Sequence, residues 1–514
     1  MRAGMIGRRG LVLAAPALAF ATAARGQGST PFTLGVASGE PSPTGVVLWT
    51  RLAPDPLQGG GMGAAPVEVT WMIAEDEALR RPVRQGTAMA VAADAHSLHV
   101  EVEGLQPGRW YWYRFTAMGQ ASAIGRTRTA PAPGTMPTSL HVAVAACQQY
   151  EHGFFGAHRH IAASAPDLVA FLGDYIYEAS WGRNLVRHHG TPTARTLADY
   201  RNRYALYHGD ADLQAAHAAC PWLVTWDDHE VANDYANDVG ERERGASFLA
   251  RRAAAYQAFW EHMPLRRAAK PEGPNTRLHR RVAFGDLAEF HMLDDRQYRD
   301  PQACQAEGRG GSTRVTFPGC PAMADPARSI LGADQEAWLE DGLRRGRARW
   351  SVVGQQTRMA RLGSAGTVPP GSAGAAPVYW TDGWDGYQPA RRRLLEAMER
   401  APGTALVLGG DIHAFLAAEL RPDFDRPETP PVAVEFVATS ITSQSGGRYA
   451  VPYVNDPHIA FADASRRGWL SLRLTAGRAE AAMQAVVDAA DPATAAQTLR
   501  RYVVEAGRPR LMAG

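Results

Sequence analysis

The sequence predicts a small all-β sandwich followed by a larger layered α/β domain. Three observations lead to this fold class. The chain has 514 residues, which is too many for a single compact core. Residues 32–132 contain short strand-like runs separated by turn residues, as in an all-β module. From Ser139 onward, short apolar runs alternate with helical stretches, which is typical of strands and helices in a layered α/β domain.

The first 27 residues have the pattern of an export signal. Arg8 and Arg9 precede an apolar run over residues 11–24, and small residues follow near a cleavage point. Paired arginines favour the twin-arginine export machinery as a partner, while an ordinary secretory signal with two arginines fits the charge pattern equally well. No other run of the sequence is long and apolar enough to span a bilayer. We therefore expect residues 1–27 to be an export signal and the protein to be periplasmic or secreted.

Residues 30–133 are predicted to form the sandwich. The turn before Trp110 resembles the turn that precedes an aromatic strand in fibronectin-type sandwiches, and Pro131 to Gly134 form a linker-like segment. The exposed aromatic residues of this module can pack against neighbours or stack on a ligand, and packing is the favoured interpretation. The strand-like runs cover residues 46–49, 67–73, 98–102 and 110–116.

Residues 138–514 are predicted to form the α/β domain. Short apolar runs bounded by turn signals are typical of buried strands of a largely parallel sheet. These runs cover residues 141–145, 168–172, 222–226, 289–293, 350–353, 405–408 and 432–437. The helical stretches cover residues 154–163, 248–262, 334–345 and 390–400. The last segment, residues 492–506, is predicted to be a C-terminal helix that packs back on this domain.

Composition argues against two classes of partner. The formal net charge is only +2, and 21% of the residues are charged, so no stable nucleic-acid or membrane partner is expected. Of the four cysteines, Cys304 and Cys320 lie in a Gly-, Pro- and Arg-rich loop, the usual setting of a disulfide in an oxidising compartment. The sequence leaves open whether they are bridged. Cys220 is predicted to be a buried, small apolar side chain.

The second predicted strand ends in groups that suit a metal ion. After residues 168–172, Gly173 permits a tight turn, Asp174 follows directly, and Tyr177 comes three residues later. In open α/β sheets, ligands bind at the carboxyl ends of the strands. A carboxylate and a phenol are hard oxygen ligands for a highly charged cation. A lone Gly-Asp pair is typical of a simple turn, so the prediction depends on the other strands.

Three more predicted strands end in similar groups. They are followed by Cys147, by Asp227, Asp228 and His229 with Asn233 shortly after, and by Asp411 and His413. Four such endings at one edge of one sheet predict a metal site. Alternation along Asp411, Ile412 and His413 predicts that both ligand side chains point to the same side and that Ile412 points into the core.

These motifs resemble those of the calcineurin-like metallophosphoesterases. The third motif reads Asp-Asp-His-Glu and the last reads Gly-Asp-Ile-His. With Cys147 in the first position, these departures from the superfamily pattern match the PhoD-like alkaline phosphatases. The resemblance extends over nearly the whole mature chain, and two further family-like blocks begin at Met292 and Asp382.

The resemblance implies a ligand set. Asp174 would bridge the metals, and Cys147, Tyr177 and His413 would complete a site for ferric iron (Fe3+). A second ion, calcium (Ca2+), would be bound by Asp228, Asn233 and Asp411 together with Asp174. Asp227 would be a direct ligand or a carboxylate that orients one, and both options stay open.

The activity implied is hydrolysis of phosphate esters by a metal-activated hydroxide at a multinuclear site. The substrate would be a small-molecule, lipid or nucleotide phosphoester, with monoesters favoured and diesters left open. Asp174 and His229 are the catalytic candidates: His229 would contact the phosphate or protonate the leaving oxygen, or else orient a ligand. Arg159 and Arg296 are candidates for phosphate binding, although a structural ion pair is the favoured alternative for both.

Two other functions compete with this prediction. The same metal chemistry would support a phosphodiesterase or a phospholipase D-type activity. A non-catalytic surface protein with this fold is disfavoured, because a decayed site usually lacks at least one ligand and this chain has the full set. The oligomeric state is not predicted.

Overall fold

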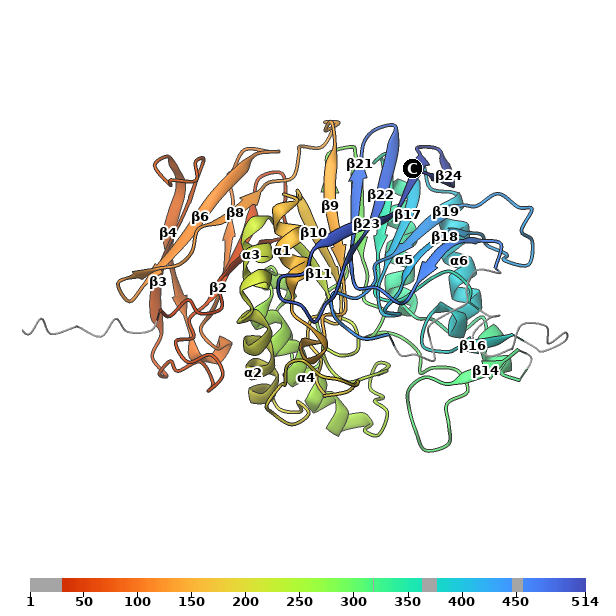
Figure 1. Cartoon of the computed structure of the whole chain (residues 1–514), viewed down its shortest axis with the longest axis horizontal. Coiled ribbons are helices and arrows are strands. Elements are labelled where there is room, and N and C mark those ends of the chain that lie inside the picture. Colours follow the sequence, from red (N-terminus) through yellow and green to blue (C-terminus); the bar gives the residue numbers. More distant parts are fainter. Residues whose placement is uncertain (1–29, 318, 363–376, 446–455) are drawn as a thin grey trace, which may run out of the picture.

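The computed structural model describes residues 30–317, 319–362, 377–445 and 456–514 (Figure 1). The predicted export signal, residues 1–27, lies outside these ranges. Within them, no helix combines the length and the apolar character that crossing a bilayer requires.

Two large β-sheets form the centre of the molecule. The first has ten strands, and its parallel centre consists of β9 (Leu140–Ala145), β10 (Leu168–Leu172) and β11 (Trp222–Thr225). To one side of these lie β21 (Gly468–Leu474), β22 (Arg478–Val486), β23 (Ala496–Glu505) and β24 (Arg508–Ala513). To the other side lie β1 (Val36–Gly39), β2 (Val46–Arg51) and β5 (Ser97–Val102).

The second sheet has seven strands in the order β12-β13-β15-β17-β19-β18-β20. Its parallel centre consists of β13 (Ala288–Met292), β15 (Trp350–Gly354), β17 (Thr404–Gly409) and β19 (Ala433–Val437). Antiparallel strands flank it: β12 (Arg280–Phe284), β18 (Phe415–Leu420) and β20 (Ile459–Asp463).

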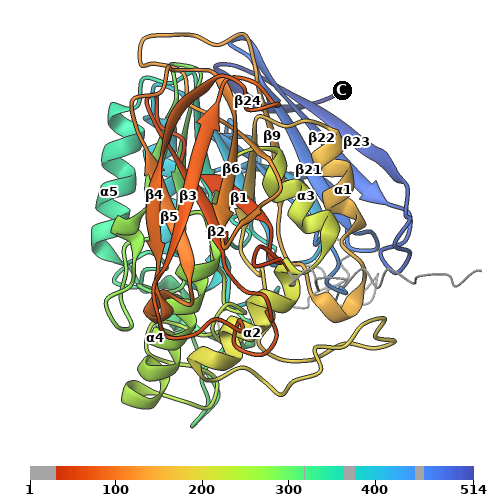
Figure 2. The same ribbon diagram turned by 90° about the vertical axis from the view of Figure 1, so that its left-hand side faces the viewer.

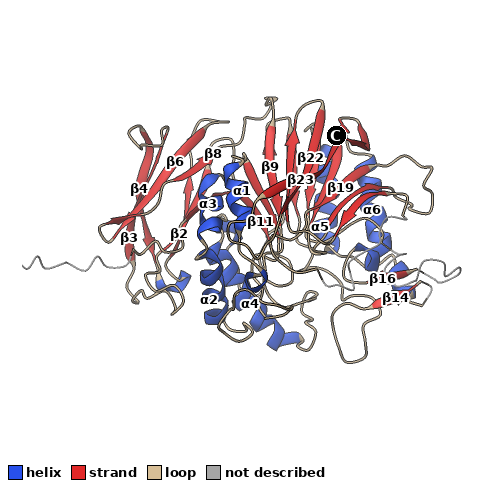
Figure 3. Ribbon diagram, viewed as in Figure 1, coloured by secondary structure: helices blue, strands red, loops and turns tan. Residues whose placement is uncertain are grey.

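The two sheets stack face to face between two layers of helices. One hydrophobic core lies between the sheets, and a core on each outer face packs against helices. Figure 2 shows α1 and α5 on opposite sides of the strands, and Figure 3 shows the helices as two separate groups. The first group comprises α1 (Gly156–Ala163), α2 (Leu197–His208), α3 (Ala211–Ala219) and α4 (Gly245–His262). The second comprises α5 (Gly332–Arg345) and α6 (Gln388–Glu399).

Burial on both faces explains why the central strands are continuous apolar runs. Along β10, Leu168, Ala170 and Leu172 pack between the sheets, whereas Val169 and Phe171 pack against the first helix layer. Because side chains alternate faces along a strand, a strand buried on both sides must be apolar at every position.

The N-terminal region is a sandwich whose inner sheet is part of the ten-stranded sheet. Its outer sheet contains β4 (Pro82–Ala90), β3 (Val67–Ala74), β6 (Trp110–Ala117), β7 (Gln120–Ala121) and β8 (Gly125–Arg128). Its inner sheet, β1-β2-β5, continues the ten-stranded sheet because β1 pairs in parallel with β11. A separate core lies between the outer and inner sheets. The sandwich is therefore built into the α/β domain by strand pairing.

The predicted C-terminal helix over residues 492–506 is wrong. Residues 496–505 form strand β23, which pairs antiparallel with β22 along its length. The alanines and arginines of this segment favour a helix locally. The unpaired edge of β22 provides a pairing partner that local propensity does not register.

The other predicted strands and helices of the α/β domain appear within a few residues of their predicted bounds. The expectation of one sheet is wrong, because β17 belongs to the second sheet while β9, β10 and β11 belong to the first. Their ligand-bearing ends still meet because the two sheets stack face to face.

Candidate metal centre

The turns after the central strands place several polar residues in a left-handed backbone conformation. Cys147, Asp174, Asp234, Asp411 and His413 have φ angles between 51° and 63°, and Gly173 has a φ of 101°. For residues with a β-carbon this conformation costs about 1–3 kcal/mol each and clusters at functional sites. The strained backbone therefore indicates a functional site at the same strand ends where the candidate ligand residues occur.

Cys147, Asp174 and His413 form the first ligand group. One ligand atom from each lies within 4.8 Å of the others. The Tyr177 hydroxyl donates to Asp174 Oδ2 at 2.8 Å, lies 3.1 Å from His413 Nε2, and accepts from Ser443 at 2.8 Å. The structure thus brings together the four residues assigned to Fe3+ by resemblance.

Two further groups overlap with the first. Asp174, Asp228 and His229 place ligand atoms within 4.8 Å of one another, and so do Asp228, Asp234 and Asp382. Asp174 belongs to the first and second groups, and Asp228 to the second and third. The three groups therefore form one continuous cluster.

Sequence reasoning missed Asp234 and Asp382. Asp234 accepts from the Ser312 backbone N–H at 3.0 Å, and Asp382 is buried at 3% exposure among arginines. Asp382 opens a block that resembles the family, but no metal role was inferred from it. Asp234 directly follows the predicted ligand Asn233, and this adjacency is the one sequence feature that could have identified it.

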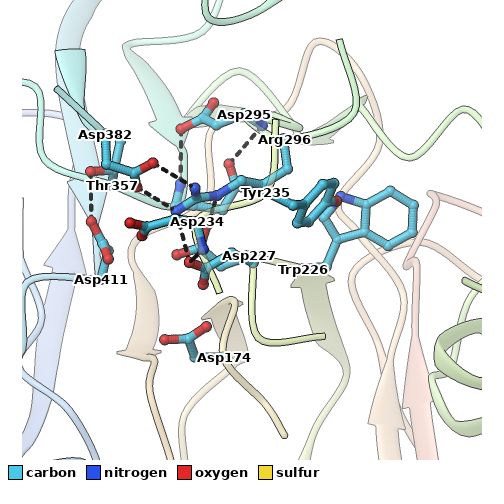
Figure 4. Close-up of polar contacts among 12 residues, drawn as sticks. Asp174, Trp226, Asp227, Asp234, Tyr235, Asp295, Arg296, Thr357, Asp382 and Asp411 are labelled. Carbon is cyan, nitrogen blue, oxygen red and sulfur yellow. Dashed lines mark hydrogen bonds and ion pairs between the residues drawn. The ribbon is translucent and has the colours of Figure 1, made fainter. Parts of the chain in front are cut away.

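Arg296 forms ion pairs with Asp382 of the cluster and with the neighbouring Asp227. Its guanidinium donates to Asp227 and, at 3.0 Å, to Asp382 (Figure 4). The side chain is 1% exposed. Its donors are thus engaged by carboxylates, so the structural ion pair is the alternative that the structure favours over phosphate binding.

Arg159 does not take part in the cluster. It binds Asp212 at 3.0 Å and the carbonyl oxygens of Pro492 and Thr494. These bonds tie α1 to α3 and to the segment before β23. The structure therefore shows for Arg159 the structural ion pair that the sequence analysis favoured over phosphate binding.

Asp411 and His413 do not continue an extended strand, contrary to the alternation argument. Both have positive φ, so the chain turns and sends the two side chains to different partners. His413 contacts Tyr177, whereas Asp411 accepts from the Thr357 hydroxyl at 2.9 Å. Asn233 makes its own contacts outside the three groups: its side-chain amide donates to Glu241 at 2.9 Å.

Two buried glutamates hold the loops of the site. Glu230 accepts from the backbone N–H groups of Asp174 at 3.0 Å, Tyr175 at 2.6 Å and Asp227 at 2.7 Å, so one carboxylate joins the ends of β10 and β11. Glu178 accepts from His229 Nδ1 at 2.7 Å and from the Asn233 backbone at 2.9 Å. Neither glutamate was assigned a role from the sequence.

The cluster is rich in buried acidic groups. Burial raises the pKa of the Cys147 thiol well above its usual range, and Asp174, Asp411 and Asp227 raise it further. Burial also raises the pKa of Asp174 well above its usual range and that of Asp411 to about 6. Burial works against the charged form of His229, yet the carboxylates of Glu178, Asp228 and Asp174 raise its pKa well above its usual range. Asp174 Oδ1 and Asp227 Oδ2 are buried without a hydrogen-bond partner in the described part of the chain.

Comparison with known proteins agrees with this architecture. A PhoD-like phosphatase family model matches residues 142–483, and a model of the PhoD-like phosphatase N-terminal domain matches residues 17–131. The chain is 43% identical to alkaline phosphatase D of Bacillus subtilis (strain 168) over 511 residues, covering 96% of this chain and 85% of that protein. A solved structure of PhoD is 41% identical, with a TM-score of 0.86, and the match covers 94% of this chain and 92% of that one.

The four-layer fold, the cluster at the strand ends and these matches define a phosphoric ester hydrolase. The chain belongs to the PhoD-like phosphatase family, as its motifs predicted.

Proposed function

We propose that this protein is an exported alkaline phosphatase that hydrolyses phosphomonoesters at a multinuclear metal centre. The observation that carries the proposal is the continuous cluster, in which Asp174 and Asp228 each belong to two of three overlapping ligand groups. Shared carboxylates are what a site for neighbouring metal ions requires.

The donors fit the two metals implied by the family. Cys147, Tyr177, His413 and Asp174 offer sulfur, phenol, imidazole and carboxylate, which suit Fe3+. Asp228, Asp234 and Asp382 offer only oxygen, which suits Ca2+. The buried oxygens of Asp174 and Asp227 that have no hydrogen-bond partner also support bound metal, because a buried carboxylate oxygen without a partner is energetically costly. Asn233 and Asp411 stay calcium ligands by resemblance alone.

Bound metals would lower the pKa of a water and neutralise phosphate charge. The protein's own groups supply the rest. Since Glu178 occupies His229 Nδ1, Nε2 is the nitrogen left to donate a proton to the leaving oxygen. Arg296, bonded to Asp227 and Asp382, offsets their charge and holds these carboxylates in place.

The proposal is tested by hydrolysis of a chromogenic phosphomonoester and of its diester at alkaline pH, with and without Ca2+. Faster turnover of the monoester, stimulated by Ca2+ and lost to a chelator, supports it. A diester rate far above the monoester rate points to a phosphodiesterase. If metal-loaded protein turns over neither ester, the family fold serves a non-catalytic role here.

Export forms a separate part of the proposal. The Cys304–Cys320 disulfide supports it, since structural disulfides persist in oxidising compartments. Replacing Arg8 and Arg9 by lysines should retain the protein in the cytoplasm if the twin-arginine machinery carries it. Unchanged periplasmic or secreted yield from that variant would favour an ordinary secretory route.

A further inference from the structure

A cavity of about 300 Å³ adjoins the metal cluster. It lies between the loop after β10, the loop after β11 and the first turns of α4, and its lining includes Glu178, Asn233, Arg195, Arg242, Glu243 and Arg251. Glu178 connects the cavity to the reaction centre, because its carboxylate binds His229 at 2.7 Å. The cavity therefore lies one side chain away from the imidazole of His229, which belongs to the second ligand group.

The charges of the lining leave one cation without a partner. Glu178 is paired with His229 and Glu241 with Arg309 at 2.7 Å. Glu243 forms ion pairs with both Arg195 and Arg251. Arg242 is exposed, and across the described ranges no acidic group or hydrogen-bond acceptor contacts its guanidinium. The cavity thus presents a cation that no described residue neutralises.

We propose that this cavity is a subsite for a second anionic group of the substrate, with Arg242 as its recognising cation. The inference rests on the proposed function and adds the class of substrate: phosphoesters whose organic part carries a further phosphate, sulfate or carboxylate. A guanidinium binds such groups through paired, charge-assisted hydrogen bonds. A volume of about 300 Å³ is at the small end of ligand sites, which suits a compact anion on a short linker.

The test uses full-length, metal-loaded protein and two series of non-hydrolysable probes. Calorimetry compares ω-sulfoalkylphosphonates of three to six carbons with alkylphosphonates of equal length. The phosphonate occupies the cluster, and the sulfonate reports on the cavity without chelating metal. We expect the best sulfonate to bind roughly three- to tenfold more tightly than its alkyl counterpart, and this advantage to shrink at high salt.

The matched variants are Arg242→Gln and Arg244→Gln. Arg244 is also exposed, lies two positions along the chain at the start of α4, and is not part of the lining. Arg242→Gln should abolish the sulfonate advantage and leave alkylphosphonate binding unchanged, whereas Arg244→Gln should leave both unchanged.

The subsite proposal is rejected if the two probe series bind with equal affinity at every length. It is also rejected if Arg242→Gln and Arg244→Gln lose the sulfonate advantage equally. Phosphomonoester turnover without a sulfonate advantage rejects the subsite while the proposed function stands. A sulfonate advantage without turnover of any phosphoester keeps the subsite and rejects the proposed function. If neither series binds, both proposals fail.

Discussion

Asp174 is the residue on which the site converges. It belongs to two ligand groups, accepts from Tyr177 at 2.8 Å and is held by its backbone N–H on Glu230. Its φ of 55° shows that the turn stores strain to present this carboxylate. The neighbouring Gly173 has no such cost at its φ of 101°, and a β-carbon there would lie 2.6 Å from Asp227.

Asp174→Asn should abolish phosphomonoester turnover. The amide keeps the size of the side chain but removes the charge shared by two ligand groups, so we expect kcat to fall by at least roughly a hundredfold, with loss of bound metal. Steady-state kinetics and elemental analysis measure both. Asp341→Asn is the control, at a half-buried position on α5 that forms ion pairs with Arg344 and Arg345. Full activity and metal content in Asp174→Asn would disprove the assignment.

Arg296 and Arg159 separate two roles that arginine can play. Arg296 is buried between Asp227 and Asp382, whereas the Arg159 side chain is 40% exposed and pairs with Asp212. Removing one partner of a buried ion pair costs about 3–5 kcal/mol, and an exposed pair contributes about 0–1 kcal/mol. Arg296→Met should therefore lower the free energy of unfolding far more than Arg159→Met. Urea denaturation compares the two variants, and equal losses of unfolding free energy would mean that Arg296 does not form the buried structural ion pairs described above.

At the scale of elements, the β-sandwich and the catalytic sheet are one continuous structure. β1 pairs with β11, Trp49 Nε1 donates to the Glu261 carbonyl at 3.0 Å, and Arg51 lies 2.8 Å from His262 Nε2. Deleting residues 30–133 would expose the edge of β11 and unpair these buried groups. We expect the truncated protein to be insoluble or unfolded by circular dichroism. A folded, soluble fragment with an unchanged KM would show that the sandwich is only a packing partner.

The disulfide-closed loop supports the third ligand group. Cys304 and Cys320 are bridged over a sequence separation of 16. Near this loop, Gln302 donates to Asp382 at 2.8 Å and Ser312 binds Asp234. Opening a loop of this size costs about 3 kcal/mol in the chain-entropy model.

Replacing both cysteines by serine should therefore weaken Ca2+ binding measured by calorimetry. Serine in place of the free, buried Cys220 tests whether any loss of a cysteine has the same effect. Unaltered Ca2+ affinity in the double variant would separate the loop from the metal site.

At the scale of the whole molecule, buried histidines make stability depend on pH. Burial lowers the pKa of His158, His208 and His291 to about 3 and that of His99 and His279 to about 4. These groups are neutral in the folded protein and take up protons on unfolding below about pH 6.5. Their contribution is therefore complete above pH 6.5 and is lost as the pH falls toward the folded values, by about 1.4 kcal/mol per pH unit for each group.

His99→Gln should lower the number of protons taken up on unfolding by up to about one, and should therefore make the unfolding free energy depend less steeply on pH. The His99 ring is fully within the core, stacked 4.0 Å from Trp260. His188 is exposed, so His188→Gln should leave the slope unchanged. Urea unfolding of both variants between pH 5 and 7 measures the slope, and identical slopes would contradict the prediction.

The sequence by itself determined the central strands, the helices α1, α4, α5 and α6, the residue types at the strand ends and the family, whereas α2 and α3 were not predicted. These features depend on local patterns: a short apolar run such as 168–172 favours a strand buried on both faces, and Gly173-Asp174 favours a turn. The candidate ligands Cys147, Asp174, Tyr177, Asp228 and His413 could be predicted because each lies within a few residues of a strand end.

Only the tertiary structure decided how distant segments pair. It assigned β17 to a second sheet, turned residues 496–505 into a strand, brought Asp234 and Asp382 to Asp228, and committed Arg296 to two carboxylates. The physical reason is that strand pairing and ion pairing depend on which buried edges and charges meet in space. No local pattern encodes those partners, so the same residues were compatible with a helix, a surface acid or a phosphate-binding arginine until the sheets were stacked.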